Sequence, residues 1–172
     1  RRAVLSRSWH FLAATNSLGP EVGAVAPLEF MPGSLDEPVA LVRGSDQEIR
    51  CLSNVCSHRA AQVVTSPGVL KQLRCPYHGR CFSLDGEVLS APGFDRPRGD
   101  LSELQLQRMG PFLFAALDPS EPFPLLDSRL ASLPWDDLQP DADSTTQWEV
   151  AAHWALYVEN YLEGLHIPFV HK

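Results

Sequence analysis

The chain lacks long hydrophobic runs and is poor in basic residues. No apolar stretch approaches the roughly 20 residues that a membrane-spanning helix requires, and no charged-then-apolar signal peptide opens the sequence. Its 14 Lys and Arg residues are outnumbered by 21 Asp and Glu residues, which gives a formal charge of −7. A net negative charge argues against a surface for nucleic acids or anionic membranes. We therefore expect a soluble, cytoplasmic protein with neither nucleic acid nor membrane as a partner.

Cysteine is also scarce. The four cysteines of the chain are Cys51, Cys56, Cys75 and Cys81. An even number allows two disulfides, but without a secretory signal, cysteines close to histidines more often indicate a metal site. Four of the six histidines belong to two compact motifs. The other two, His10 and His153, are expected to be structural.

Turn-forming residues, in contrast, are plentiful. Fifteen prolines and eleven glycines are spread along the chain, which favours short strands over a helical bundle. Asp85-Gly86 separates two β-prone runs and is a strong hairpin signal. We expect residues 1–118 to form an antiparallel β domain with strands at Trp9–Ala14, Val22–Phe30, Pro38–Val42, Glu48–Ser53, Val69–Arg74, Cys81–Leu84, Glu87–Ser90, Ser102–Arg108 and Phe112–Leu117.

A connector is expected at residues 119–145, where repeated prolines leave room for at most one short helix, around Leu125–Leu133. A strand at Thr146–Ala151 and a helix at Trp154–His166, ended by Pro168, are predicted to follow. The apolar stripe of that helix consists of Trp154, Tyr157, Val158, Tyr161, Leu162 and Leu165.

The first candidate site combines two short motifs. Cys56-Ser57-His58 is followed, after sixteen residues, by Cys75-Pro76-Tyr77-His78. Two loops that each offer one thiolate and one imidazole fit a [2Fe–2S] cluster in which one iron takes both cysteines and the other takes both histidines. The same four residues could hold one zinc ion, but zinc fingers usually group their cysteines and then their histidines. A disulfide between Cys56 and Cys75 would leave both histidines unexplained.

With Arg59 after the first pair and Gly79 after the second, this pattern resembles the Rieske family. Respiratory Rieske proteins have an additional disulfide-bonded cysteine in each loop, at the positions of Ala61 and Tyr77 here. They also have hydroxyl side chains where this chain has Arg80 and Phe82. Fewer hydrogen-bond donors to the cluster imply a lower potential, as in the oxygenase and ferredoxin branches.

Position 80 bears on the branch of the Rieske family, and two further cysteines bear on the set of cluster ligands. Oxygenases of the family commonly have Trp at the position of Arg80, which leaves the subclass open. Cys51 and Cys81 match no ligand position, and we expect both to be buried free thiols.

A second candidate site lies at the end of the predicted helix and comprises Asn160, Glu163, His166 and His171. Two histidines with one carboxylate are typical of oxygen-activating ferrous iron, although a histidine pair at this spacing also occurs at ordinary helix ends. The segment resembles the start of the catalytic domain in Rieske non-haem iron oxygenase α subunits.

That resemblance implies roles for the residues of the second site. It makes His166 and His171 ligands of the mononuclear iron, and it makes Glu163 a link from this iron to the Rieske cluster of a neighbouring subunit. Asn160 is expected to support the same network. The family's third iron ligand is a carboxylate far towards the C-terminus, beyond Lys172. Glu instead of the usual Asp at position 163 occurs in branches that act on quaternary amines.

Taken together, the sequence predicts a mainly β protein, with a Rieske [2Fe–2S] domain at 1–118 and the truncated start of an α+β catalytic domain at 146–172. The expected function is that of an oxygenase α subunit that passes electrons from the cluster to mononuclear Fe(II), which activates O₂ to hydroxylate an organic substrate. Expected partners are an NAD(P)H-dependent reductase, possible assistance from a ferredoxin, and two further copies in a homotrimer. The alternatives are a non-catalytic Rieske electron carrier and a zinc-stabilised binding module.

Overall fold

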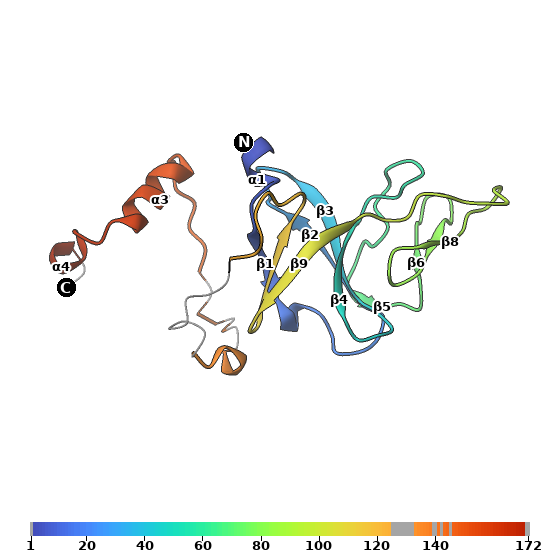
Figure 1. Ribbon diagram of the computed structural model, residues 1–172, viewed down its shortest axis with the longest axis horizontal. Coiled ribbons are helices and arrows are strands. Elements are labelled where there is room, and N and C mark those ends of the chain that lie inside the picture. Colours follow the sequence, from blue (N-terminus) through green and yellow to red (C-terminus); the bar gives the residue numbers. More distant parts are fainter. Residues whose placement is uncertain (1, 125–132, 139–140, 142, 145, 171–172) are drawn as a thin grey trace. The chain divides into compact units, whose positions relative to one another are not determined.

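The computed structural model describes residues 2–124, 133–138, 141, 143–144 and 146–170. The chain divides into two compact units, Arg1–Gln139 and Pro140–Lys172. The first unit, the β unit, contains all the strands of the described residues, and the second contains two short helices (Figure 1). The predicted domain bounds at residues 118 and 146 stay predictions.

Two antiparallel sheets form the β unit. The larger has seven strands in the order β1-β10-β9-β4-β3-β2-β5, and the smaller has three in the order β6-β7-β8 (Figure 1). Every strand pair is antiparallel, which confirms the predicted mainly β, antiparallel fold. The strands are β1 (His10–Ala14), β2 (Ala24–Phe30), β3 (Glu37–Arg43), β4 (Ile49–Ser53), β5 (Gly68–Val69), β6 (Leu73–Arg74), β7 (Cys81–Phe82), β8 (Val88–Ser90), β9 (Glu103–Met109) and β10 (Phe112–Ala116).

The described residues of this unit also form three short helical segments: α1 (Arg2–Leu5) before the first strand, and the single 3₁₀ turns η1 (Thr15–Ser17), between β1 and β2, and η2 (Trp135–Asp137), after β10. None of the helices in the described residues is long and apolar enough to cross a membrane.

One apolar core joins the two sheets. Val42 and Leu52 of the large sheet pack in the same cluster of buried residues as Leu73 and Phe82 of the small sheet, and all four are fully buried. Each such side chain stabilises the fold by about 1.5–3 kcal/mol relative to leaving it in water. The small sheet has strands of only two or three residues, so this shared core rather than its own ladder holds it in place.

The predicted hairpin at Asp85-Gly86 joins β7 and β8. Gly86 has a φ of +88°, and a Cβ there would come within 3.3 Å of both δ-carbons of Leu52. A side chain at this position would therefore be strained and would press into the core. The Ser83 hydroxyl accepts the backbone N–H groups of Asp85 and Glu87 and closes the turn.

One predicted strand, Val69–Arg74, is in fact two strands. Its first part belongs to β5, which pairs with β2, and its last part is β6, which pairs with β7. The chain leaves one sheet for the other between them, at Leu70, whose backbone N–H donates to the carbonyl of Gly23. Both ends of the predicted strand are extended, but the change of sheet depends on long-range pairing that a local pattern does not predict.

The second unit corrects two predictions. The strand at Thr146–Ala151 is wrong: these residues form no strand, because a strand needs a partner and none pairs with them in the described residues. The predicted helix ends early, as α3 (Trp154–Leu162), and Glu163 is extended with φ −105° and ψ 138°. Pro168 lies inside a second short helix, α4 (Ile167–Val170), where the first turn tolerates proline.

A further prediction cannot be compared with the structure. The short helix expected around Leu125–Leu133 falls almost entirely on residues 125–132, which lie outside the described residues.

Candidate metal centre

The two ligand loops of the β unit have the same backbone design. In the first ligand loop (residues 54–64), the backbone N–H of Cys56 donates to the carbonyl of Ala61, and the carbonyl of Cys56 accepts from Ala60. In the second (residues 75–80), Cys75 makes the equivalent bonds five and four residues ahead, to Arg80 and Gly79. Both loops are therefore tight turns that start from a cysteine and carry a histidine.

In each turn, the residue four positions after the cysteine has a left-handed backbone conformation. That residue is Ala60 in the first ligand loop, with φ +55°, and Gly79 in the second, with φ +70°. Glycine adopts this conformation without strain, whereas Ala60 does so at a cost of about 1 kcal/mol. The first loop keeps the conformation because its hydrogen bonds over-determine it.

The four candidate ligands separate into a buried pair and an exposed pair. Cys56 and Cys75 are 3% and 2% exposed. His58 and His78 are exposed, with ring centroids 4.9 Å apart. Each pair takes one residue from each loop, as expected when one iron is held by both thiolates and the other by both imidazoles.

The pKa shifts of Cys56 and His58 agree with a buried thiol pair and an exposed imidazole pair. Burial raises the pKa of the Cys56 thiol, and the neighbouring Cys75 thiol raises it further by hydrogen bonding and charge. The pKa of His58 is lowered, first by partial loss of solvent around the ring and then by the charges of His78, Arg59 and Arg80. Low pKa keeps the imidazole neutral, which is the form that binds a metal.

The alternatives from the sequence fit this arrangement less well. All four cysteines are free thiols, so Cys56 and Cys75 form no disulfide. Among the described residues, no three His, Cys, Asp or Glu side chains gather around one point that could hold a single ion. The paired thiols and paired imidazoles instead suit a two-iron group.

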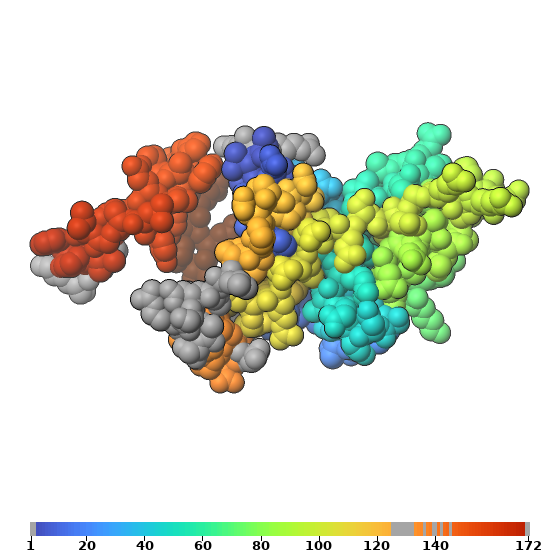
Figure 2. Space-filling model, viewed as in Figure 1, coloured from blue at the N-terminus to red at the C-terminus, as the bar shows by residue number. Residues whose placement is uncertain are grey.

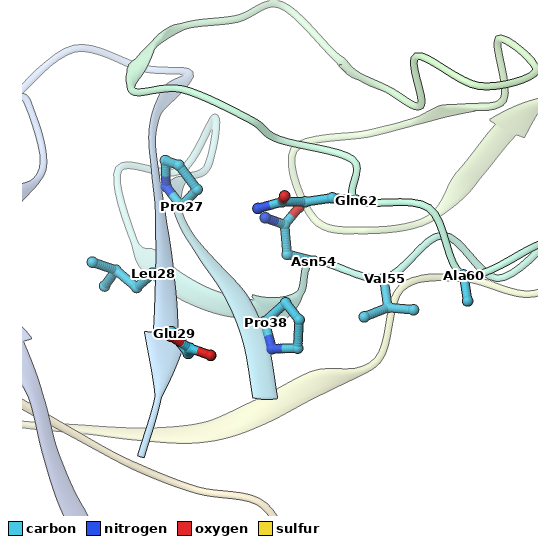
Figure 3. Close-up of a pocket in the computed structure, with 8 residues that line it drawn as sticks. All are labelled: Pro27, Leu28, Glu29, Pro38, Asn54, Val55, Ala60 and Gln62. Carbon is cyan, nitrogen blue, oxygen red and sulfur yellow. The ribbon is translucent and has the colours of Figure 1, made fainter. Parts of the chain in front are cut away.

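Asn54 anchors the first ligand loop and was missed by the sequence analysis. Its side chain is 1% exposed; the amide donates to the Val64 carbonyl at 2.8 Å, and its oxygen accepts the N–H groups of Val63 and Val64. Figure 3 shows Asn54 beside Gln62 in a pocket between β2, β3 and this loop, and no candidate ligand lines that pocket. Asn two residues before the cysteine was the available signal, since Asn readily bonds nearby backbone groups.

A third loop (residues 91–100) contacts both ligand loops and was also missed. Its Phe94 ring lies 5.9 Å from the ring of His58, at a steep angle of 74°. The Ser57 hydroxyl donates to the Gly99 carbonyl at 2.5 Å, and Arg80 Nη2 donates to the Arg98 carbonyl. In the space-filling view these turquoise to yellow-green segments lie together at one end of the β unit (Figure 2). Ala91-Pro92-Gly93 signalled a turn, but not its contact with the ligand loops.

In the second unit, three of the four predicted residues come together. Asn160, Glu163 and His166 line one groove with Tyr157, Tyr161 and Ile167. Glu163 Oε2 accepts the backbone N–H of Leu165 at 2.8 Å, and Oε1 contacts His166 Nδ1. The hydrogen bond from His166, followed by that from Leu165, lowers the pKa of Glu163. His171 lies outside the described residues.

The remaining histidines and cysteines have structural contacts. His10 Nε2 bonds the Leu5 carbonyl at 3.0 Å, and His153 Nδ1 accepts the N–H of Ala155 as the cap of α3. Burial raises the pKa of Cys51 to about 12. The Cys81 thiol donates to the Gly79 carbonyl at 3.3 Å. Cys51 and Cys81 are buried free thiols, as predicted.

Comparison with known proteins identifies the family of the β unit. Residues 9–108 match the family model described as Rieske [2Fe-2S] domain. The carnitine monooxygenase oxygenase subunit of Escherichia coli (strain K12) is 32% identical over 151 residues, which are 80% of this chain and 40% of the relative. The glycine betaine monooxygenase oxygenase subunit of Pseudomonas aeruginosa (strain UCBPP-PA14) is 32% identical over 140 residues, 75% of this chain and 32% of the relative.

Solved structures agree with these relatives. A quaternary ammonium Rieske monooxygenase in complex with an inhibitor superimposes with a TM-score of 0.58 at 25% identity, over 69% of this chain and 34% of that one. Naphthalene 1,2-dioxygenase with bound indole gives 0.61 at 25% identity, over 70% and 28%.

The chain thus spans less than half the length of the curated relatives and solved structures to which it is similar. The comparisons support one cofactor for the matched residues, a [2Fe–2S] cluster. The relatives are oxygenase subunits, and electron transfer between subunits is named for one solved structure. With residues 9–108 matched and the paired thiols and imidazoles in place, the chain belongs to the family of proteins with a Rieske [2Fe–2S] domain.

Proposed function

We propose that the chain is part of a Rieske oxygenase α subunit, in which Cys56, Cys75, His58 and His78 hold the [2Fe–2S] cluster. The observation that carries this proposal is the separation of a buried thiol pair from an exposed imidazole pair on two loops of equal backbone design. When bound, the cluster accepts and passes on one electron at a time. The division into a cluster domain at 1–118, a connector at 119–145 and the start of a catalytic domain at 146–172 belongs to the same proposal.

The residues of the first site divide the work. Cys56 and Cys75 would provide anionic ligands from the buried core, where water is excluded. His58 and His78 form the exposed edge, where a redox partner can approach closely. The donor would be an NAD(P)H-dependent reductase, either directly or through a ferredoxin. We also propose that the complete protein forms a homotrimer.

The second site would hold the mononuclear iron through His166 and His171. Glu163 contacts His166 Nδ1 and so orients the ring, as carboxylates beside metal-binding histidines do. The lowered pKa of Glu163 keeps it an anion, able to accept a hydrogen bond from a cluster histidine of another subunit. Asn160 lines the same groove and would support this network.

The proposed reaction is hydroxylation of a small organic substrate with O₂. A quaternary ammonium compound is the substrate class that we favour, because the relatives are named for carnitine, glycine betaine and choline and because position 163 is Glu. The alternative is an aromatic substrate, as the name of naphthalene 1,2-dioxygenase suggests for that enzyme. A substrate screen of the complete protein would distinguish the two substrate classes.

The first test is low-temperature EPR of the anaerobically purified, dithionite-reduced chain, together with iron and acid-labile sulfide analysis. We expect two irons and two sulfides per chain, and a Rieske spectrum whose average g lies below that of all-cysteine clusters. A silent spectrum with stoichiometric zinc would overturn the assignment of the cluster. The oxygenase proposal would then fall with it.

A further inference from the structure

Arg80 is a buried cation in the second ligand loop. It lies two residues after His78 and is 8% exposed, and Asn54 is the other buried polar side chain in the described part of the chain. Unlike Asn54, Arg80 is incompletely satisfied: Nη2 donates to the Arg98 carbonyl, but Nε has no hydrogen-bond partner within the described residues. No carboxylate of these residues forms an ion pair with it.

The guanidinium of Arg80 lies where the three loops around the site meet. A Cβ placed on Gly99 of the third loop would be 3.8 Å from Arg80 Nη2 and 3.2 Å from the Cβ of Ser57, which stands between Cys56 and His58 in the first ligand loop. Arg80 Cζ is also 5.8 Å from the centre of the Phe82 ring. The charge is thus held beside both ligand loops and shielded from water.

Burying an unpaired cation is costly, so its retention calls for a compensating negative charge nearby. Two ferric ions, two sulfides and two thiolates sum to zero, so the oxidised cluster is neutral. Reduction by one electron makes it an anion, and this anion would compensate the buried cation. A fixed positive charge therefore favours the reduced state. In a buried position it does so more strongly than an exposed charge, which water and salt screen.

We propose that Arg80 tunes the cluster, raising its reduction potential through the buried positive charge. The inference rests on the proposed set of four cluster ligands. The proposal also gives a meaning to one sequence difference. Respiratory Rieske proteins have hydroxyl side chains at positions 80 and 82, whereas this chain has no hydroxyl there and would supply the positive charge of Arg80 instead.

The test compares three variants of the chain by anaerobic redox titration at pH 7, followed by EPR. Arg80→Gln removes the charge, Arg80→Lys keeps it, and Arg74→Gln is a control that removes an exposed arginine whose Nη1 would lie 3.9 Å from a Cβ on Gly79. At the midpoint potential of the parent, we expect Arg80→Gln to lower the ratio of reduced to oxidised cluster about tenfold, which is about 59 mV for one electron. Arg80→Lys and Arg74→Gln should stay within about twofold of the parent.

Other outcomes are equally decisive. A parent chain without a Rieske spectrum would refute the proposed ligand set, whereas unchanged potentials in a cluster-loaded Arg80→Gln would refute only the role of Arg80. If Arg80→Gln binds no cluster, Arg80→Trp provides a second neutral variant, with the residue that oxygenases commonly have there, and its potential should fall similarly. Loss of the cluster from both neutral variants would make Arg80 a structural residue and overturn the proposal.

Discussion

The β unit and the C-terminal unit differ in where their apolar side chains lie. Leu41 and Phe82 in the β unit are fully buried. On α3, Tyr161 and Leu162 are 80% and 82% exposed, and no residue of that helix is buried. The apolar stripe that predicted an amphipathic helix is present, but nothing in the described part of its unit covers it.

This difference in burial distinguishes the two candidate sites. All four proposed ligands of the cluster site lie within the β unit, whereas the proposed iron site of the C-terminal unit is incomplete in the described residues. In the β unit, the core that joins the sheets also includes Cys56 and Cys75, so fold and ligands form together. In the C-terminal unit, Glu163 and His166 are arranged by local contacts alone, at the end of a nine-residue helix. Short isolated helices are marginal in water. The following changes test this contrast, starting with the largest expected effect.

Replacing Cys75 with Ser should abolish the cluster. The change removes one of two anionic ligands from a wall where no other thiol can take its place, because Cys81 bonds the Gly79 carbonyl instead. We expect iron and sulfide contents near zero and loss of the visible absorption. Cys81→Ser is the matched control, a buried thiol six residues away, and should retain the cluster. Equal loss in both variants would contradict the ligand assignment.

Truncating Leu41 to Ala should destabilise the β unit by about 3 kcal/mol, because it leaves a cavity in a fully buried position. Leu162→Ala removes the same atoms from an exposed site and should cost less than about 0.5 kcal/mol. Urea unfolding of the two variants measures both values. Similar costs would mean that α3 is buried against another part of the protein in solution.

Asn54→Ala should cost about 2 kcal/mol, because it leaves the Val64 carbonyl and the N–H groups of Val63 and Val64 without their partner. The matched control is Gln62→Ala, an exposed amide in the same pocket, with an expected change below about 0.5 kcal/mol. Urea unfolding of the cluster-free chain gives the comparison. If Gln62→Ala were the more damaging, the hydrogen bonds of Asn54 would not be what anchors the loop.

The smallest expected effect is at the cap of α3. His153→Ala removes the acceptor of the Ala155 N–H and should weaken the first turn by about 1 kcal/mol, or about fivefold in amide protection. His153→Asn, a preferred capping residue, should restore the protection. Hydrogen exchange at Leu156 and Tyr157 reports the change, and exchange in the β unit should not respond. Equal exchange in all three proteins would contradict a capping role.

Local patterns were enough to predict most of the β unit. Alternating β-prone runs predicted its strands, and Asp85-Gly86 predicted the β7–β8 hairpin, because both signals are carried by neighbouring residues. The four proposed cluster ligands were likewise named from spacing alone. What spacing could not predict was the burial of the thiols and the exposure of the imidazoles, which depend on how the two sheets pack.

Features that depend on distant partners were missed. Phe94 reaches His58 only because the third loop folds back over the first ligand loop. The strand predicted at Thr146–Ala151 has the right residue types but no neighbouring strand among the described residues. The predicted helix stops at Leu162, where the backbone of Glu163 is extended and its carboxylate accepts the N–H of Leu165 two residues ahead. Helical periodicity does not reveal this competing local hydrogen bond.

Cys56 and Cys75 are part of the core that joins the two sheets. Their burial affects the order in which the chain folds and receives its cluster. Iron and sulfide must be delivered to thiolates that a donor can reach, yet both thiols become almost inaccessible once the core is packed. Delivery and packing are therefore competing events in biosynthesis. A chain that packs its core before the cluster is delivered must therefore open its ligand loops again.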